Sequence, residues 1–579
     1  MRKTELLLLA ALATANAFAQ GDTPDPPSRI ARLNYLSGTV SFRPGTVDEW
    51  TAATLNYPIY NGDHLWADRG ARAELHIGST ALRMDSETAL AILNLDDRTV
   101  QLSLTGGALE VRLRALDDSE SFEVDTPNAA VTLLRAGEYR LFVDGEGNLT
   151  TVTVRGGDAE VTGGGSAFTV HARESARLSG ADDSFRGDVN SAAPPDDFEF
   201  WCQTRDRREE QSQSVHHVSR EMIGYEDLDE HGVWSEVPDY GWVWAPRVQA
   251  GWAPYREGHW VWVDPWGWTW VDDAPWGFAP FHYGRWANYR GGWVWVPGTV
   301  VARPVYAPAL VAFVGVAGVA WFPLGPHEVY RPAYRVSEVY VRQVNITHVN
   351  VTNINVTNVR YVNQGIGVTA VSQNVFVNAR PVHHSLIAVN ANVMGQAQVM
   401  SAAPVAPERA SVLGRAQASP GMAPPARFAD RAVIVRTPPP PSPVSFGARR
   451  EAMQANPGRP LDFRTVEGLR SNDHTRGPEI RPAIPQSPPI RPVREERAQP
   501  VIMDSTRVRP DRPVRPAQQQ ESAPAQRPVE RPRAPQQNVE QPRSEQRREA
   551  TGERKEQRSE RKQEQKKKEE RKQEERKQQ

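Results

Sequence analysis

Three Gly-Trp-x-Trp segments, Gly241-Trp242-Val243-Trp244, Gly267-Trp268-Thr269-Trp270 and Gly292-Trp293-Val294-Trp295, decide the fold in the middle of this 579-residue chain. They lie in a region, Trp234 to Trp321, that holds 14 of the 17 tryptophans. Side chains two residues apart on a strand point to the same face, so each Trp-x-Trp places two indoles side by side. The pattern predicts strands that carry paired aromatic rings on one surface.

The same region contains a repeat. Gly251-Trp252-Ala253-Pro254-Tyr255 returns as Gly277-Phe278-Ala279-Pro280-Phe281, and the Gly-Trp-x-Trp segments start 26 and then 25 residues apart. A unit of that length accommodates about two strands and two turns, so we expect three consecutive hairpins within residues 232–330. Glycines stand where a turn needs a positive φ or where an indole needs space against the backbone.

Residues 30–180 alternate apolar and polar residues in short runs. These runs are Gly38–Phe42, Ala73–Ile77, Val100–Leu104, Leu109–Leu113 and Glu138–Val143, and the turn signals between them are Gly62-Asp63, Gly106-Gly107, Gly145-Glu146-Gly147 and Gly156-Gly157. Period-two runs separated by turn residues predict an antiparallel β-sandwich or roll.

This segment resembles the ligand-sensor domain of the FecR family. The resemblance rests on the order of short motifs, which are Gly38-Thr39-Val40, Asn61-Gly62-Asp63, Ala71–Leu75, Gly107–Val111, Thr126–Val131, Gly137–Arg140 and Val152–Val161. It implies an all-β periplasmic module without catalytic residues. Residues 232–330 in turn resemble the tryptophan-rich region that follows FecR-type domains in bacterial secreted proteins, a family without an established biochemistry.

The N-terminus predicts export. Residues 1–19 have the features of a cleaved signal peptide, because Arg2 and Lys3 precede the apolar run Leu6–Ala13, and Ala17-Phe18-Ala19 offers small residues for cleavage before Gln20. Cys202 is the only cysteine, so neither an intrachain disulfide nor a multi-cysteine metal site can form. We expect a periplasmic or secreted bacterial protein.

Val305–Gly325 is uncharged but does not favour a membrane span. Pro308, Gly315, Gly318 and Pro323 interrupt it, so we expect a buried hairpin and no transmembrane span. Residues 331–400 include three Asn/Val/Thr pentads between Asn345 and Val359, and they predict an extended segment.

Residues 401–579 have the composition of a disordered tail. They are rich in Pro, Arg and Gln and carry 37 Lys and Arg against 24 Asp and Glu, whereas residues 1–400 carry 31 and 46. We expect no core here, with stiff polyproline at Pro438–Pro443. A basic tail behind an acidic body fits a polyanionic partner, although solvation of a charged tail explains the composition equally.

The linker, residues 181–231, predicts one short helix at Arg205–Glu210, with mixed charges that suit contact with solvent. His216-His217 is a weak metal signal, because adjacent histidines on a helix diverge and no third ligand is apparent. We therefore expect no metal site and no cofactor.

Six tryptophans are candidate ligand-binding residues: Trp260, Trp262, Trp268, Trp270, Trp293 and Trp295. Exposed indoles stack on sugar rings, whereas buried indoles form the core of a small sheet. Small domains bury only about 60% of their surface, so some of the 14 rings are expected to line a groove or meet a partner. Val243, Val261 and Val294 make the opposite strand face apolar too, which leaves open which face meets water.

Four carboxylates near these tryptophans, Glu257, Asp264, Asp272 and Asp273, suggest an alternative, because glycoside hydrolysis uses a carboxylate pair. Asp264-Pro265 and Asp272-Asp273-Ala274-Pro275 are also ordinary turn sequences in which aspartate bonds to its own backbone. The sequence therefore favours a protein that is not an enzyme.

Together these observations predict an all-β exported envelope protein that binds or assembles through its two β modules. The partners we expect are a cell-envelope glycan, an anionic polymer or another envelope protein, and nothing indicates specific nucleic-acid binding. The alternatives are a FecR-type sensor or regulator of envelope signalling and, less favoured, a carbohydrate-active hydrolase.

Overall fold

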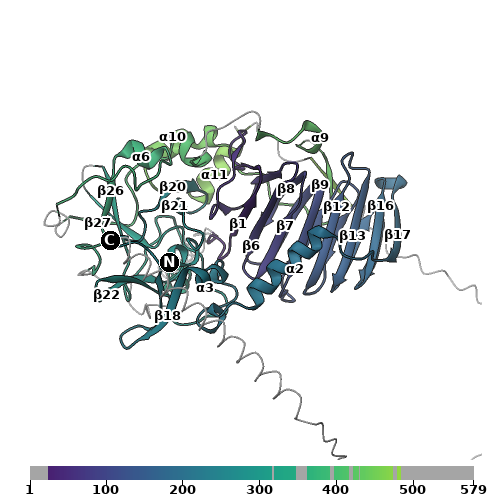
Figure 1. Cartoon of the computed structure of the whole chain (residues 1–579). Helices are drawn as coiled ribbons and strands as arrows, with labels where there is room; N and C mark the ends of the chain where they lie inside the picture. The colour runs from purple at the N-terminus through teal and green to yellow at the C-terminus, as the bar shows by residue number, and fades with distance from the viewer. Residues whose placement is uncertain are drawn as a thin grey trace, which may run out of the picture. The chain divides into compact units, whose positions relative to one another are not determined.

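The computed structural model describes residues 24–315, 318–346, 361–390, 397–415, 422–429, 431–471, 473 and 479–483. All of these residues belong to one compact unit, residues 1–491. The predicted signal peptide, most of the Asn345–Val359 pentads and the tail beyond residue 483 lie outside the described residues. The described elements are mostly strands, so the predicted all-β class is confirmed (Figure 1).

Residues 31–191 form two sheets whose apolar inner faces share one core, as the alternation predicts. Sheet A contains β1 (Ala31–Ser37), β4 (Pro58–Ile59), β6 (Arg72–Ile77), β7 (Thr80–Met84), β12 (Gly137–Val143), β13 (Leu149–Gly156), β16 (Glu174–Ser179) and β17 (Arg186–Ser191). Sheet B contains β2 (Val40–Arg43), β3 (Thr51–Ala52), β5 (His64–Ala67), β8 (Thr88–Leu95), β10 (Ser121–Asp125), β11 (Ala130–Leu133), β14 (Asp158–Gly163) and β15 (Ser166–His171).

One long strand, β9 (Thr99–Leu113), belongs to both sheets. Its first half pairs with β8 and, in parallel, with β10, while its second half pairs with β7 and β12. The predicted turn at Gly106-Gly107 is therefore wrong, because the chain bends there and continues into the other sheet. Gly107 has a φ of +84°, and a Cβ on it would lie 2.4 Å from the Cα of Thr88, so the bend requires glycine.

Three hairpins follow at the predicted repeat. They are β18 (Gly232–Val237) with β19 (Gly241–Pro246), β20 (Gly258–Val263) with β21 (Gly267–Asp272), and β22 (Arg285–Tyr289) with β23 (Gly292–Val296). The first and third join into one sheet through β19 and β23, whereas the second forms its own. Tryptophan faces tryptophan across each hairpin: Trp234 with Trp244, Trp260 with Trp270, Trp262 with Trp268, and Trp286 with Trp295.

The predicted buried hairpin is present as β24 (Val311–Val314) and β25 (Val319–Pro323), both buried. Among the described residues, no helix combines the length and hydropathy that crossing a membrane requires. β26 (Thr369–Val371) and β27 (Val399–Met400) extend this sheet at its two edges. With the helices α5 (Glu338–Asn345) and α6 (Gln373–Val377), they correct the prediction of an extended segment for the described part of residues 331–400.

Several parts of residues 401–483 pack against the two β modules, which corrects the prediction of disorder from Ser401 for those parts. Their elements are α8 (Arg409–Leu413), α9 (Ala426–Ala429), β28 (Val433–Val435), α10 (Phe446–Ala455), α11 (Phe463–Arg470) and β29 (Ile480–Pro482). Val405, Val412, Phe428 and Phe446 are all buried. Composition could not reveal this, because the few apolar residues are widely spaced and each packs onto a surface that earlier residues have built.

The segment before the hairpins contains more than the predicted short helix. It holds α2 (Asp197–Glu210) and α3 (Leu228–His231), with 3-10 turns η1 (Asp182–Ser184), η2 (Ser214–His216) and η3 (Tyr225–Asp227). Another short helix, α4 (Ala279–His282), stands between the second and third hairpins.

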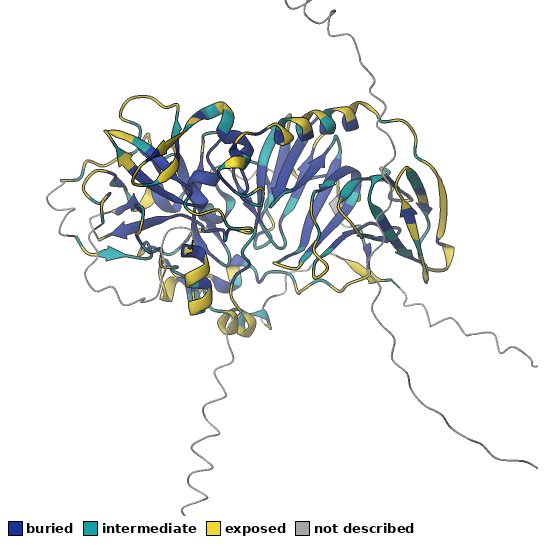
Figure 2. Ribbon diagram, turned by 90° about the horizontal axis from the view of Figure 1, so that it is seen from below, coloured by how far each residue is buried: buried dark blue, intermediate teal, exposed yellow. Residues whose placement is uncertain are grey.

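The aromatic residues of the hairpins form a core rather than a surface. Figure 2 colours the buried residues of the fold dark blue. Ten of the 14 tryptophans between Trp234 and Trp321 are buried, and only Trp242 is exposed. Seven of these ten indole nitrogens donate to acceptors of the chain, for example Trp244 to the carbonyl of Leu228 at 3.0 Å and Trp321 to that of Tyr255 at 3.1 Å. Each satisfied indole N–H removes a desolvation penalty that a buried donor would otherwise carry.

Gly232 provides a test of this packing. A Cβ at this position would lie 2.2 Å from Cε2 of the buried Trp244, whose ring is held by its bond to Leu228. We expect Gly232→Ala to lower the free energy of unfolding by about 1–3 kcal/mol, as overpacking does. Urea unfolding followed by tryptophan fluorescence measures this. Gly292→Ala is the control, since its nearest atom would be 3.8 Å away, and equal losses in both variants would contradict the prediction.

Candidate functional site

The outer face of sheet A carries a stripe of charged side chains. Glu74 and His76 alternate on β6, Arg83 stands on β7, Arg112 lies near the end of β9, and Arg114 directly follows that strand. Alternation along each strand sends these residues away from the sandwich core. Glu74, His76 and Arg83 are nevertheless buried, so something must cover this face.

Helix α2 is the main cover, and it crosses the strands of sheet A (Figure 1). Asp196 caps its N-terminus by accepting from the backbone N–H of Phe198 and Glu199, and Glu199 completes a capping box. Phe198 and Cys202 pack on Ala108 of β9. The prediction of a solvent-facing helix is therefore wrong: its acidic residues pair with the sheet instead of with water.

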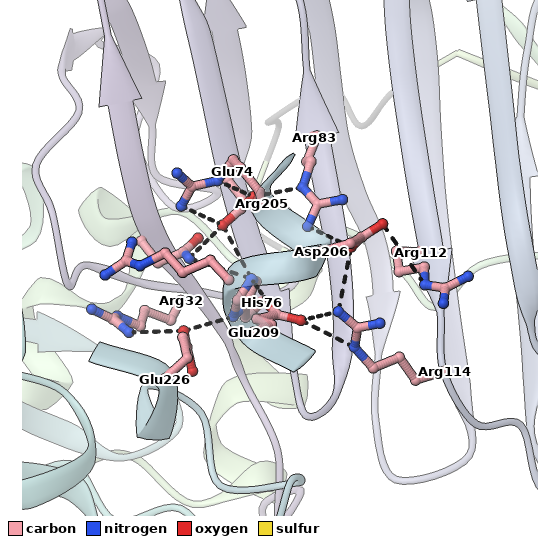
Figure 3. A network of polar contacts seen from close by, with 12 residues as sticks. Arg32, Glu74, His76, Arg83, Arg112, Arg114, Arg205, Asp206, Glu209 and Glu226 are labelled. Carbon is pink, nitrogen blue, oxygen red and sulfur yellow. Dashed lines mark hydrogen bonds and ion pairs between the residues drawn. The ribbon is translucent and has the colours of Figure 1, made fainter. Parts of the chain in front are cut away.

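His76 is the centre of the resulting network (Figure 3). Its Nδ1 lies 3.0 Å from Glu226, and its Nε2 lies 2.9 Å from Glu209 and 3.2 Å from Glu74. Burial alone would lower the pKa of His76, but the Glu209 and Glu226 carboxylates raise it well above the ordinary value. Each ring nitrogen therefore faces a carboxylate, and the raised pKa favours the imidazolium form.

Arginines neutralise the carboxylates around that ring. Glu74 accepts from Arg83 at 2.6 Å and from Arg205 at 2.8 Å, and Glu209 accepts from Arg114 at 3.0 Å. Burial acts to raise both carboxyl pKa values, but Arg83 and His76 outweigh it at Glu74, and His76 and Arg114 bring the pKa of Glu209 to about 2. Both groups are thus held as carboxylates.

Arg32 extends the network to the tryptophan-rich region. Its guanidinium lies 2.7 Å from Asp227 and 3.6 Å from Glu226, and it donates to the carbonyl of Pro275 at 2.8 Å. Asn56 adds bonds to the carbonyls of Asp272 and Ala274 at 2.9 and 2.7 Å. The charged site is therefore the junction between the sandwich, α2 and the start of the hairpin module.

His76, Glu209 and Glu226 are also a possible ligand set for a metal ion. The geometry suits a protonated histidine better than a metal ion. Glu209 faces Nε2 and Glu226 faces Nδ1, and a single ion can bind only one of these two ring nitrogens. The nearby Arg32 and Arg114 would also repel a cation. We therefore interpret the site as a proton-dependent junction.

The six candidate binding tryptophans do not form an exposed face. Trp260, Trp262, Trp268, Trp270 and Trp295 are buried and Trp293 is half-buried, so the predicted sugar-stacking surface is corrected for the five buried rings. The expectation of exposed rings assumed that residues 232–330 fold as an isolated small domain. In the structure other parts of the chain cover the rings, among them Phe376, whose ring lies 4.4 Å from that of Trp268.

The exposed indole is one that the sequence did not single out. Trp242 lies beside His217, with ring centroids 4.3 Å apart, and His217 also lies 4.4 Å from Trp234. Burial lowers the pKa of His217. The histidine pair of the linker thus contributes one ring to an aromatic stack.

The four carboxylates of the hydrolase alternative, Glu257 among them, lie at the ends of strands β20 and β21 or directly beside them. Asp272 is buried and accepts from the indole of Trp270 and the backbone of Ala274, both at 3.0 Å. Asp264 pairs with Arg449 at 2.7 Å and Asp273 with Arg415 at 3.1 Å. Burial raises the pKa of Asp272 well above its usual range, and the geometry gives each aspartate a structural partner.

A cavity of about 970 Å³ lies where sheet B, the turn after β20 and the C-terminal segment meet. Aromatic residues in its lining include Trp50, Tyr57, Tyr60, Trp262, Phe428 and Phe463. Burial raises the pKa of Asp63 to about 7, opposed by bonds from the backbone of Tyr60 and Gly45, and lowers the pKa of His64 to about 3. The cavity therefore combines aromatic walls with charged residues of both signs, among them Arg43, Asp264 and Arg470.

The fold and the junction define a two-module β protein. Residues 225–328, which start beside the junction and contain all three hairpins, match DUF6600, a family of unknown function. Two crystal structures of a candidate anti-sigma factor from Parabacteroides distasonis ATCC 8503, at 1.65 and 2.50 Å resolution, are similar at 15% and 16% identity. Each match covers 22% of this chain and 59% of that protein, less than two thirds of its length, with a TM-score of 0.20. No curated protein matches the chain. The resemblance of residues 30–180 to the FecR family stays a prediction.

The junction predicts a specific pH dependence. The pKa of His76 is higher in the folded protein than in the unfolded chain, where it is near 6.5. Its contribution to the free energy of unfolding is therefore complete below pH 6.5 and is lost as the pH rises through the pKa of the folded protein. The pKa values of Glu74 and Glu209 are lowered in the folded protein, so these two groups stabilise it above about pH 4.5 and lose that stabilisation as the pH falls further. We expect the stability difference between the wild type and His76→Gln to be largest between about pH 4.5 and 6.5 and to shrink above that.

Urea unfolding at a series of pH values, followed by tryptophan fluorescence, measures this difference. His171→Gln, a substitution at an exposed histidine of the same sandwich, is the matched control. A wild-type advantage over His76→Gln that is as large at pH 9 as at pH 6 would contradict the imidazolium assignment.

Proposed function

We propose that this protein is an exported, non-enzymatic component of the bacterial cell envelope with a binding or assembly role. The observation that carries the proposal is the cavity of about 970 Å³ between the two β modules and the C-terminal segment. A concave site with aromatic walls and a few polar groups, held by strands, is the usual form of a binding site. The structural roles of Asp264, Asp272 and Asp273 favour binding over hydrolysis.

The basic tail supplies a second contact in this proposal. Residues 492–579 carry 24 Lys and Arg against 17 Asp and Glu, whereas residues 1–400 are acidic. Such a segment attracts anionic polymers through long-range charge, an attraction that salt screens over about 10 Å at 0.1 M. Because parts of residues 401–483 pack onto the β modules, we assign the tether to residues 492–579.

Export is tested by cell fractionation of a bacterial host that expresses the full chain. We expect the mature protein in the periplasmic or secreted fraction, with Gln20 as its first residue, because the predicted signal peptide ends at Ala19. N-terminal sequencing of the recovered protein checks the cleavage site. Recovery of the chain in the cytoplasm with its first 19 residues intact would contradict the proposal.

The tether is tested by binding to immobilised poly(glycerol phosphate), a model anionic envelope polymer. We expect the full chain to bind with an affinity that falls as salt rises, and deletion of residues 492–579 to abolish that binding. The unit ending at Arg491 is left whole by this deletion, and its unfolding curve is the control. Undiminished, salt-sensitive binding without the tail would reject the tether.

A further inference from the structure

The outer face of sheet B is covered by one C-terminal segment, which we call the strap (residues 424–429 and 431–443). Phe428 is its anchor: the ring is buried against Trp66, with centroids 5.1 Å apart, and against Ala89. A Cβ on Gly106 would lie 2.3 Å from the Phe428 ring, so the bend of β9 leaves room for this anchor. Thr105 Oγ1 donates to the carbonyl of Phe428 at 2.8 Å.

Beyond the anchor, the strap is held as an extended chain with basic side chains. The backbone N–H of Ile434 donates to the Thr126 carbonyl at 2.9 Å. The Glu123 carboxylate accepts the N–H groups of Arg436 and Thr437 at 2.9 and 3.2 Å. These bonds join sheet B to the main chain of the strap, so they do not depend on most of the strap's side chains.

Charge adds to the fit between strap and sheet. Arg436 pairs with Glu160 of β14, and Arg431 donates to the carbonyls of Thr105 and Gly145. The carboxylates of Glu160 and of Glu123 on β10 give the covered face negative charge, which suits a basic extended segment. A cationic occupant is therefore the one whose charge matches this face.

The strap leaves part of this face unsatisfied. Beneath it, Asp125 Oδ1 and Gln101 Oε1 are buried without a hydrogen bond, although Gln101 donates to the Thr437 carbonyl at 2.7 Å. Burial raises the pKa of Asp125 well above its usual range, and the adjacent Glu123 adds to that effect. The cavity of about 970 Å³ also remains open beside Pro439–Pro443. Buried acceptors without donors and unfilled volume both weaken a contact.

We propose that the outer face of sheet B is a docking face for an extended, basic segment of a partner protein, and that the strap is its resident occupant until the partner displaces it. The partner would keep the main-chain bonds to Glu123, add a guanidinium or ammonium donor at Asp125 and fill the cavity with an apolar side chain. This inference rests on the proposed binding role and names the partner of that site.

Displacement can be measured with the full chain and a fluorescent synthetic peptide of residues 424–443. Phe428→Ala weakens the resident strap but leaves Glu123 and Asp125 unchanged, so we expect the peptide to bind this variant at least tenfold more tightly than the wild type. Glu123→Gln, added to Phe428→Ala, should lower the peptide's affinity at least tenfold. Fluorescence anisotropy gives both affinities.

Controls keep this test specific. Phe200→Ala replaces an exposed phenylalanine on α2, on the opposite side of the sandwich, and should leave peptide affinity at the wild-type value. A scrambled peptide of the same charge should bind at least tenfold more weakly than the strap peptide. Arg436→Ala weakens the strap at a half-exposed side chain and should give about a threefold gain if Phe428→Ala does not fold.

Three results would overturn the proposal: no saturable binding to Phe428→Ala or Arg436→Ala, equal binding of the scrambled peptide, or no loss with Glu123→Gln. A concentration-dependent dimer that the peptide dissociates would assign the face to a second copy of this chain, which also overturns it. If the peptide experiment fails while export and the tether are confirmed, the proposed function still holds. Failure of the docking proposal is therefore distinguishable from failure of the proposed function.

Discussion

Burial of the indole rings between Trp234 and Trp321 is the constraint on which the rest of the structure depends. Three hairpins have too little surface of their own to hide ten tryptophans, so other segments must cover them. Tyr57 from the sandwich, Phe376 from α6 and Val405 from the C-terminal segment belong to the same core cluster. The hairpins therefore serve as the packing centre around which segments far apart in sequence assemble.

The two outer faces of the sandwich are covered in different ways, with different consequences. Sheet A meets α2 through paired charges centred on His76, and such buried ion pairs specify how elements dock more than they add net stability. Sheet B meets the strap through main-chain bonds and one aromatic anchor, and it keeps unsatisfied acceptors beneath it. The first cover is a network of ion pairs between side chains, whereas the second relies on main-chain bonds and one anchor ring.

Local patterns predicted the elements but not their surroundings. The Gly-Trp-x-Trp spacing gave three hairpins, and the proline and glycine positions gave β24 and β25, because strand and turn signals are contained in a few neighbouring residues. Whether the tryptophans are exposed, and whether residues 401–483 fold, depends on contacts between residues that are hundreds of positions apart in the sequence. The junction was missed for the same reason: Glu74 and His76 were visible as an alternation, but Glu209 and Glu226 lie more than a hundred residues further along the chain.

An occupant within the same chain sets a threshold for any partner of sheet B. Tethering gives the strap an effective concentration of the order of millimolar, so a partner of equal intrinsic affinity would be excluded at cellular concentrations. A partner gains only through interactions that the strap lacks, and the unpaired oxygen of Asp125 and the open cavity are where such interactions are possible. The imperfect fit of the strap therefore favours selectivity: a ligand that merely copies the strap is rejected, while one that also donates a hydrogen bond to Asp125 can displace it.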